Sequence, residues 1–389
     1  MGQYTTMLRT PGVLRIVASQ LFARFPFGMM SLGFVLHIQQ QTGSYAMAGL
    51  ALGFETAGVA VSGPLLGYWM THFGARRTIL TTASISTLTI LTIGLAPIHD
   101  WLLVGLCLIV GLTSPPIQSA VRTIYPQLVD RKNMTTIYSL DASLQEIIWV
   151  VGPILATFIA AYVSTSAGIV VLGVIQITGA LWFTSNPEVK ALKLKRPNRK
   201  MGRVLKNRIV IANAVMGGLL VGSFSGVEVG TAGTLDIAMT GWVIAALSVG
   251  SLIGGFAFGH RSKTKYALSK FLCVVLVGYS IVYFAPDNPG WLVFSWFVAG
   301  LGVAPALGLL GAIIGANVPT EDAAEAYGWI STGQMLGYAG AAATVGFLID
   351  AISPAASLSV AAIFTLGALL VSLYAARFTP VISTTEESK

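Results

Sequence analysis

The sequence predicts an all-α polytopic membrane protein with twelve transmembrane helices arranged as two pseudo-symmetric six-helix bundles. The first observation is composition: 54% of the 389 residues are hydrophobic and only 10% are charged, with a mean hydropathy of +0.77. A soluble domain carries about a quarter of charged residues. The second observation is a series of apolar runs about 20 residues long, each sufficient to cross roughly 30 Å of hydrocarbon as a helix. The third is an internal repeat that divides the chain in two.

The apolar runs give the predicted spans in order. They cover residues 13–38, 44–70, 77–97, 101–123, 136–163, 165–184, 208–232, 238–260, 266–285, 290–316, 324–350 and 353–376. Only short segments separate them, apart from a basic linker near the middle of the chain. The expected domains are therefore a bundle over 1–184, a cytoplasmic linker over 185–207, a second bundle over 208–377 and a cytoplasmic tail over 378–389.

The formal net charge of +8 is unevenly distributed between the two sides of the predicted membrane. Lys and Arg lie before the first span, after spans two, four and eight, and most densely in the 185–207 linker. The alternate loops instead carry Asp100, Asp236, Asp287 and Asp350 and no Lys or Arg. This is the positive-inside pattern, and it places both termini of a plasma-membrane protein in the cytoplasm. Because the basic charge follows the membrane topology, we expect a lipid bilayer and no nucleic acid as partner.

Glycine and proline positions recur between the two halves. Gly58, Gly63 and Gly67 have counterparts at Gly250, Gly255 and Gly259, 192 residues later, and Pro116 and Gln145 have counterparts at Pro305 and Gln334, 189 residues later. Matches that keep their spacing through several helices indicate a duplication. Glycines four residues apart, such as Gly63 and Gly67, allow helices in a membrane to approach closely. They also provide smooth surfaces for two bundles that move against each other.

The segment GYWMTHFGARR follows the second span and contains Gly67, Gly74, Arg76 and Arg77. With twelve helices in two halves and a basic central linker, it resembles the major facilitator superfamily, whose cytoplasmic motif has this glycine and arginine pattern. Thr71 stands where the family usually has an aspartate. The resemblance implies a secondary transporter that works by alternating access.

Charged residues inside predicted spans are functional candidates, because they are costly in a bilayer unless paired or hydrated. Arg24 lies about 14 Å into the first span and Glu146 about 17 Å into the fifth, measured from the same side. We therefore expect them to pair or to share a hydrated cavity. Arg122 and Asp141, both near the cytoplasmic ends of their spans, form a second predicted pair.

Two further carboxylates lie within spans. Glu55, near the middle of the second span, is a candidate proton carrier because desolvation disfavours a charged carboxylate. Glu228 lies toward the outer face of the seventh span, where it could select cations or lie at the interface. The residues that we expect to line a substrate cavity are Phe27, Gln145, Trp149, Phe224, Glu228 and Gln334.

No metal-ligand cluster, nucleotide-binding glycine loop or nucleophile motif is present in the sequence, so we expect neither an enzyme nor a cofactor or metal. Gly152 and Pro153 match a fragment of the motif that antiporters of the family carry in their fifth helix. We therefore predict proton-coupled efflux of small amphipathic or drug-like molecules by a monomer. The alternatives are proton-linked uptake or sugar and metabolite release by the same fold, and a membrane receptor or interaction subunit that does not transport.

Overall fold

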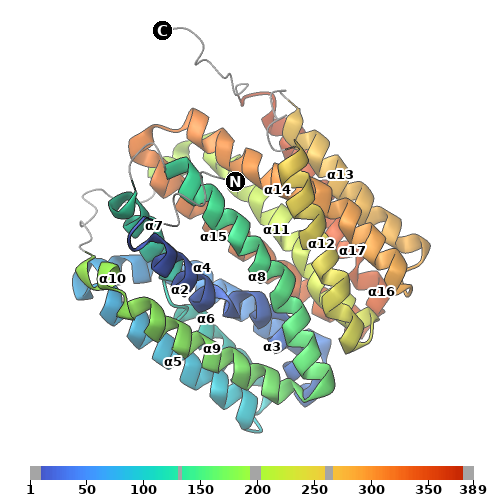
Figure 1. Cartoon of the computed structure of the whole chain (residues 1–389). Coiled ribbons are helices and arrows are strands. Elements are labelled where there is room, and N and C mark those ends of the chain that lie inside the picture. Colours follow the sequence, from blue (N-terminus) through green and yellow to red (C-terminus); the bar gives the residue numbers. More distant parts are fainter. Residues whose placement is uncertain (1–9, 130–133, 193–202, 259–265, 380–389) are drawn as a thin grey trace.

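The computed structural model describes residues 10–129, 134–192, 203–258 and 266–379, and all regular secondary structure in these ranges is helical (Figure 1). Eleven segments of the described chain are long and apolar enough to cross a membrane. The predicted all-α polytopic fold is therefore confirmed. The remaining predicted span, 324–350, lies in a helix of 32 residues that is less apolar than the other eleven.

The helices of the first half follow one another through short turns. They are α2 Val13–Arg24, α3 Pro26–Thr42, α4 Tyr45–Phe73, α5 Ala75–Leu95, α6 Asp100–Leu112, α7 Ile117–Leu128, α8 Met134–Tyr162, α9 Thr165–Ser185 and the short α10 Pro187–Ala191. The second half contains α11 Arg208–Thr234, α12 Ile237–Phe258, α13 Ala267–Ile281, α14 Pro289–Asn317, α15 Thr320–Ala351, α16 Pro354–Ser357 and α17 Ser359–Ala375.

Proline breaks two of the predicted spans into pairs of helices. The first span becomes α2 and α3, which are separated at Phe25, where Pro26 begins α3. The fourth becomes α6 and α7, with Pro115 and Pro116 between them. Proline has no backbone N–H to donate to the preceding turn, so the helix ladder is interrupted at both places. The first break matters most, because Arg24 is the residue that ends α2.

Helices α2 to α9 lie on one side of the molecule and α11 to α17 on the other (Figure 1). The two sets meet mainly where α4 packs on α15 and α8 packs on α12, with a smaller contact between α3 and α11. The predicted boundaries of two bundles at residues 184 and 208 remain a proposal, which these contacts support. One cluster of buried apolar side chains extends across the contact between the two sets of helices.

We call the end of the molecule that carries Arg76, Arg77 and Lys190 the basic end, and the end that carries Asp236 and Asp350 the acidic end. At the acidic end, α4 and α15 touch backbone to backbone. A Cβ added at Gly49 would lie 2.3 Å from the Ala342 carbonyl oxygen, and one added at Gly346 would lie 2.2 Å from the Tyr45 carbonyl oxygen. Real Cβ atoms do not approach so closely, so only glycine permits this contact.

The same two helices separate toward the basic end. Gly67 lies 18 residues beyond Gly49, which is five helical turns and hence the same face of α4. Gly328 stands in the same relation to Gly346 on α15. A Cβ added at Gly67 or Gly328 would meet no described atom within 4 Å outside its own helix turns. The two halves of the chain are therefore closed at the acidic end and open between α4 and α15 at the basic end.

This geometry corrects one expectation about the repeated glycines. Gly63 and Gly67 make no close contact with another described helix, because they lie where α4 and α15 have separated. Their counterpart Gly255 does pack, with its Cβ position 3.2 Å from the Cβ of Ala304. Gly259 lies outside the described residues.

Candidate transport site

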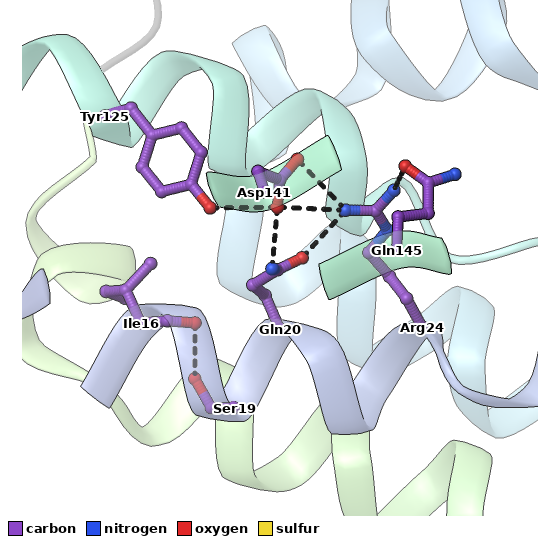
Figure 2. Close-up of polar contacts among 7 residues, drawn as sticks. All are labelled: Ile16, Ser19, Gln20, Arg24, Tyr125, Asp141 and Gln145. Atoms are coloured by element: carbon purple, nitrogen blue, oxygen red, sulfur yellow. Dashed lines mark hydrogen bonds and ion pairs between the residues drawn. The ribbon is translucent and has the colours of Figure 1, made fainter. Parts of the chain in front are cut away.

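Arg24 is the last residue of α2, and its side chain is only 4% exposed. Its Nη1 lies 3.3 and 3.4 Å from the two carboxylate oxygens of Asp141 on α8. The same nitrogen donates to the Gln20 Oε1 at 2.9 Å, and Nη2 donates to the Gln145 Oε1 at 2.6 Å (Figure 2). The guanidinium is thus held by one carboxylate and two amides, which satisfy the hydrogen-bonding requirement of a buried charge.

The Asp141 carboxylate accepts further hydrogen bonds besides its ion pair with Arg24. Its Oδ1 accepts hydrogen bonds from the Gln20 Nε2 at 2.8 Å and from the Tyr125 hydroxyl at 3.0 Å, in addition to Arg24 (Figure 2). These side chains come from α2, α7 and α8, all in the first half of the chain. We refer to Gln20, Arg24, Tyr125, Asp141 and Gln145 as the Arg24 cluster. It is a neutralised and mutually hydrogen-bonded set of groups.

One predicted ion pair is corrected by this arrangement: Arg24 pairs with Asp141 and not with Glu146. The predicted contact of Arg122 with Asp141 stays a prediction. The depth estimate considered the rise along each helix and not the direction of each side chain. Asp141 and Gln145 are four residues apart and face α2 together, whereas Glu146 is rotated by about 100° from Gln145.

Glu146 is partly buried and makes no hydrogen bond or ion pair with the described residues. Glu146 therefore remains a candidate for binding a proton or a cationic group, but it is not the partner of Arg24. The helix that carries Glu146, α8, packs tightly against α3 six residues further on. A Cβ added at Gly152 would lie 2.5 Å from the backbone of Gly28. Gly152 of the Gly-Pro fragment thus packs α8 against α3.

A second polar site lies where the two halves of the chain meet. The Tyr338 hydroxyl on α15 donates a hydrogen bond to the Glu228 carboxylate on α11. Ser31 on α3, from the first half, lies beside both groups. We call Ser31, Glu228 and Tyr338 the Glu228 site. Sequence reasoning selected Glu228 but missed Tyr338 and Ser31, because a hydroxyl in an apolar helix gives no signal comparable to a charge.

Glu55 on α4 is a further buried carboxylate, and the residue is 7% exposed. The Thr56 hydroxyl donates to its Oε2 at 3.1 Å. Arg15 pairs with Glu188 and Arg24 with Asp141, whereas neither Glu55 nor Glu228 has a basic side chain within 4.0 Å among the described residues. Among the described residues, Asp141 is therefore neutralised by Arg24, whereas Glu55 and Glu228 have only hydroxyl donors.

The other predicted cavity residues are dispersed. Phe27 and Phe224 are partly buried, and Trp149 is exposed on α8, where its carbonyl oxygen accepts a hydrogen bond from Ser248 on α12 at 3.2 Å. Gln334 packs against Gly217 on α11, whereas its repeat counterpart Gln145 is bound to Arg24. No hydrogen bond or ring contact between described residues joins the three aromatic side chains to the Arg24 cluster or to the Glu228 site, so their place in a cavity stays a prediction.

The glycine and arginine motif lies at the basic end, between α4 and α5. Gly74 has φ of +83°, a conformation that favours glycine, and it links the two helices. Arg76 and Arg77 line a small cavity of about 290 Å³ together with Phe73 and Lys190. Thr71 donates to the Tyr68 carbonyl of its own helix at 2.8 Å, so this position carries no charge toward the arginines.

A bundle of membrane-spanning helices that is closed at one end, open at the other and polar inside is typical of a transporter. The model of the Major Facilitator Superfamily matches residues 16–232 and 228–388. The chain belongs to this superfamily, and it is a transporter and not an enzyme. Among solved structures, it is similar to one described as "Crystal structure of nucleoside transporter NupG", with a TM-score of 0.71 and 13% identity over 95% of this chain and 99% of that one. No curated protein matches the sequence.

Proposed function

We propose that the chain exports small amphipathic molecules across the plasma membrane in exchange for protons, by alternating access. Secondary transport itself follows from the superfamily, and the solved nucleoside transporter has the same fold. We further propose that the basic end faces the cytoplasm, in line with the positive-inside distribution of Lys and Arg, and that the monomer is the working unit. The conformation described above is then inward-facing.

The observation that carries the proton coupling is the Glu228 site. A charged carboxylate that is removed from water without a cation is costly, so a proton is the simplest ligand that neutralises it. The Glu228 carboxylate contacts Tyr338 of its own half and lies beside Ser31 of the other half. Gaining or losing a proton there changes a contact between the two halves, and hence the balance between inward-facing and outward-facing states.

The Arg24 cluster has a different proposed role. Its Asp141 already has a cation and two further donors, so its charge is balanced without a proton. We propose that the cluster fixes α2 against α8 and presents polar groups toward the substrate path. Glu55 and Glu146 lie within the helices of the first half without a basic partner among the described residues, and we retain them as additional candidate proton sites.

The direction of transport and the substrate class rest on the aromatic residues and on the Gly-Pro fragment. Phe27, Trp149 and Phe224 favour an amphipathic substrate, and the Gly-Pro fragment at Gly152 and Pro153 favours antiport. The similar solved structure is described as a nucleoside transporter, but an identity of 13% supports the fold and not the cargo. Proton-linked uptake, or sugar and metabolite release, is the alternative within the same fold.

The experiment uses inverted membrane vesicles with an acid interior and a pH-sensitive dye inside. Candidate compounds, including amphipathic cations and nucleosides, are added outside. Substrate-dependent loss of protons from the lumen is the expected result for export by antiport. Proton entry that requires substrate in right-side-out vesicles would instead establish uptake. Binding without flux in either orientation would favour the non-transporting receptor.

A further inference from the structure

We propose that Asp350 holds the acidic end closed by capping α4 from the opposite half of the chain, and that loss of this cap shifts the protein toward a state open at the acidic end. We call Asp350 with Ser44, Tyr45 and Ala46 the Asp350 cap. The proposal rests on the alternating-access function above and assigns a positioning residue to it.

The cap consists of three hydrogen bonds to a single carboxylate. Asp350 Oδ2 accepts from the Ser44 hydroxyl at 2.6 Å and from the Ala46 backbone N–H at 2.8 Å, and Oδ1 accepts from the Tyr45 backbone N–H at 3.1 Å. Asp350 is the next-to-last residue of α15, and Ser44 is the residue that precedes α4. Residues about 300 positions apart in the chain are thus joined at one helix terminus.

The chemistry of a helix N-terminus explains why a carboxylate binds there. The first N–H groups of a helix have no acceptor within the helix, and the helix dipole favours a negative charge at that end. Ser44 already caps α4 locally, because its hydroxyl oxygen accepts from the Met47 N–H at 3.1 Å. Asp350 satisfies the N–H groups of Tyr45 and Ala46, which the local cap leaves without an acceptor. The carboxylate therefore adds a connection between the two halves of the chain.

The cap can exist in only one of the two access states. Directly beneath it, α4 and α15 meet at Gly49 and Gly346, and five turns away they have separated at Gly67 and Gly328. If the two halves close at the basic end by rocking as bundles, the acidic ends of α4 and α15 must move apart. All three hydrogen bonds to Asp350 are then lost. The cap consequently stabilises the closed acidic end relative to the open one, which is the differential contact that a population shift requires.

Asp236 offers a matched control. It is an exposed aspartate at the same end of the molecule, directly before α12. Within the described part of the chain, only its backbone oxygen accepts hydrogen bonds, from the Met239 N–H and from the Thr240 N–H and hydroxyl. Asp236→Asn therefore removes the same charge from the same end without breaking a contact between the two halves.

The test measures cysteine labelling at both ends of the α4–α15 contact. Cys273 is exposed and is replaced by serine, while Cys107 is buried and is kept. Ala342→Cys reports on the acidic end, because Ala342 is 0% exposed beneath the cap. Gly328→Cys reports on the basic end. Each reporter is combined with Asp350→Asn or Asp236→Asn, and labelling rates with a polar maleimide are measured on the purified full chain.

We expect Asp350→Asn to increase the labelling rate at Ala342→Cys by roughly tenfold and to decrease the rate at Gly328→Cys, in keeping with a population shift of about 1.4 kcal/mol. Asp236→Asn should change neither rate. Unchanged labelling at both reporters in Asp350→Asn would overturn the proposal. So would faster labelling at Ala342→Cys alone, because that result would indicate local fraying of α4. Since no substrate or proton gradient is involved, failure here would leave proton-coupled export standing.

Discussion

Asp141 on α8 and Glu228 on α11 are both carboxylates within transmembrane helices, but only Asp141 has a basic partner among the described residues. Asp141 has the Arg24 guanidinium at 3.3 Å and hydrogen bonds from Gln20 and Tyr125. Glu228 receives a hydrogen bond from Tyr338 and has no basic partner within 4.0 Å among the described residues. The first carboxylate belongs to one half of the chain, and the second lies where the two halves meet.

This difference separates a structural charge from a coupling charge. A proton added to Asp141 would leave the buried Arg24 without its counter-ion, which is unfavourable. A proton added to Glu228 would remove a charge that nothing else balances. Coupling between protons and conformation is therefore more easily built at Glu228, where the contact also joins the two halves.

The largest expected effect comes from Arg24→Ala. It leaves Asp141 inside the bundle without a cation, which should lower the free energy of unfolding by about 3–5 kcal/mol. Thermal unfolding in detergent measures the loss. Arg15→Ala is the matched control, because the Arg15–Glu188 pair lies at the surface, with Arg15 half exposed, and should contribute less than about 1 kcal/mol. Equal losses in the two variants would show that the Arg24 cluster is not a buried structural unit.

A smaller decrease in the free energy of unfolding is expected for a substitution that moves α8 away from α3. Gly152→Ala adds a Cβ that would lie 2.5 Å from Gly28, so the helices must separate, at a cost of about 1–3 kcal/mol. Gly105→Ala on α6 adds a Cβ that meets no described atom within 4 Å and should be neutral or slightly stabilising. Denaturation midpoints of the two variants give the comparison. A Gly152→Ala protein as stable as the parent would contradict the close packing of α3 and α8.

Tyr338→Phe should lower the free energy of unfolding by no more than about 1.5 kcal/mol and should impair coupling. It removes the hydroxyl that donates to Glu228, and a hydrogen bond to a charged group contributes about 1.5 kcal/mol, which corresponds to roughly a tenfold change in proton-driven transport. Tyr327→Phe is the control, because the Tyr327 hydroxyl donates to the Gly311 carbonyl at 3.0 Å and not to a carboxylate. Similar transport by both variants would argue against a role for Tyr338 in the Glu228 site.

The sequence was sufficient to predict the fold and to identify Arg24 as a buried charge. Apolar runs separate the spans, and the cost of a buried cation made a partner for Arg24 necessary. The partner itself was predicted wrongly, because depth depends on the rise of a helix alone, whereas pairing also depends on its rotation. Glu146 and Asp141 are only five residues apart along α8. The long side chain of Arg24 can reach the depth of either residue, so depth alone does not select the partner.

Contacts between the two halves could not be predicted in the same way. Tyr338 and Ser31 approach Glu228 only because α15, α3 and α11 meet, and no local pattern in any of these helices indicates that meeting. Gly49 and Gly67 are equally good candidates for close packing by sequence. Gly49 packs closely against α15 and Gly67 does not, because the halves are closed at one end and open at the other. That difference is a property of the conformational state.

The most direct test of the account compares two transport modes in proteoliposomes that contain Glu228→Gln. Counterflow exchanges labelled for unlabelled substrate without a proton gradient, whereas accumulation driven by a pH gradient requires coupling. The account predicts that Glu228→Gln retains counterflow and loses gradient-driven accumulation, and that Glu146→Gln has the smaller effect on accumulation. Full accumulation in Glu228→Gln would contradict the assignment, and its loss only in Glu146→Gln would place proton coupling in the first half of the chain.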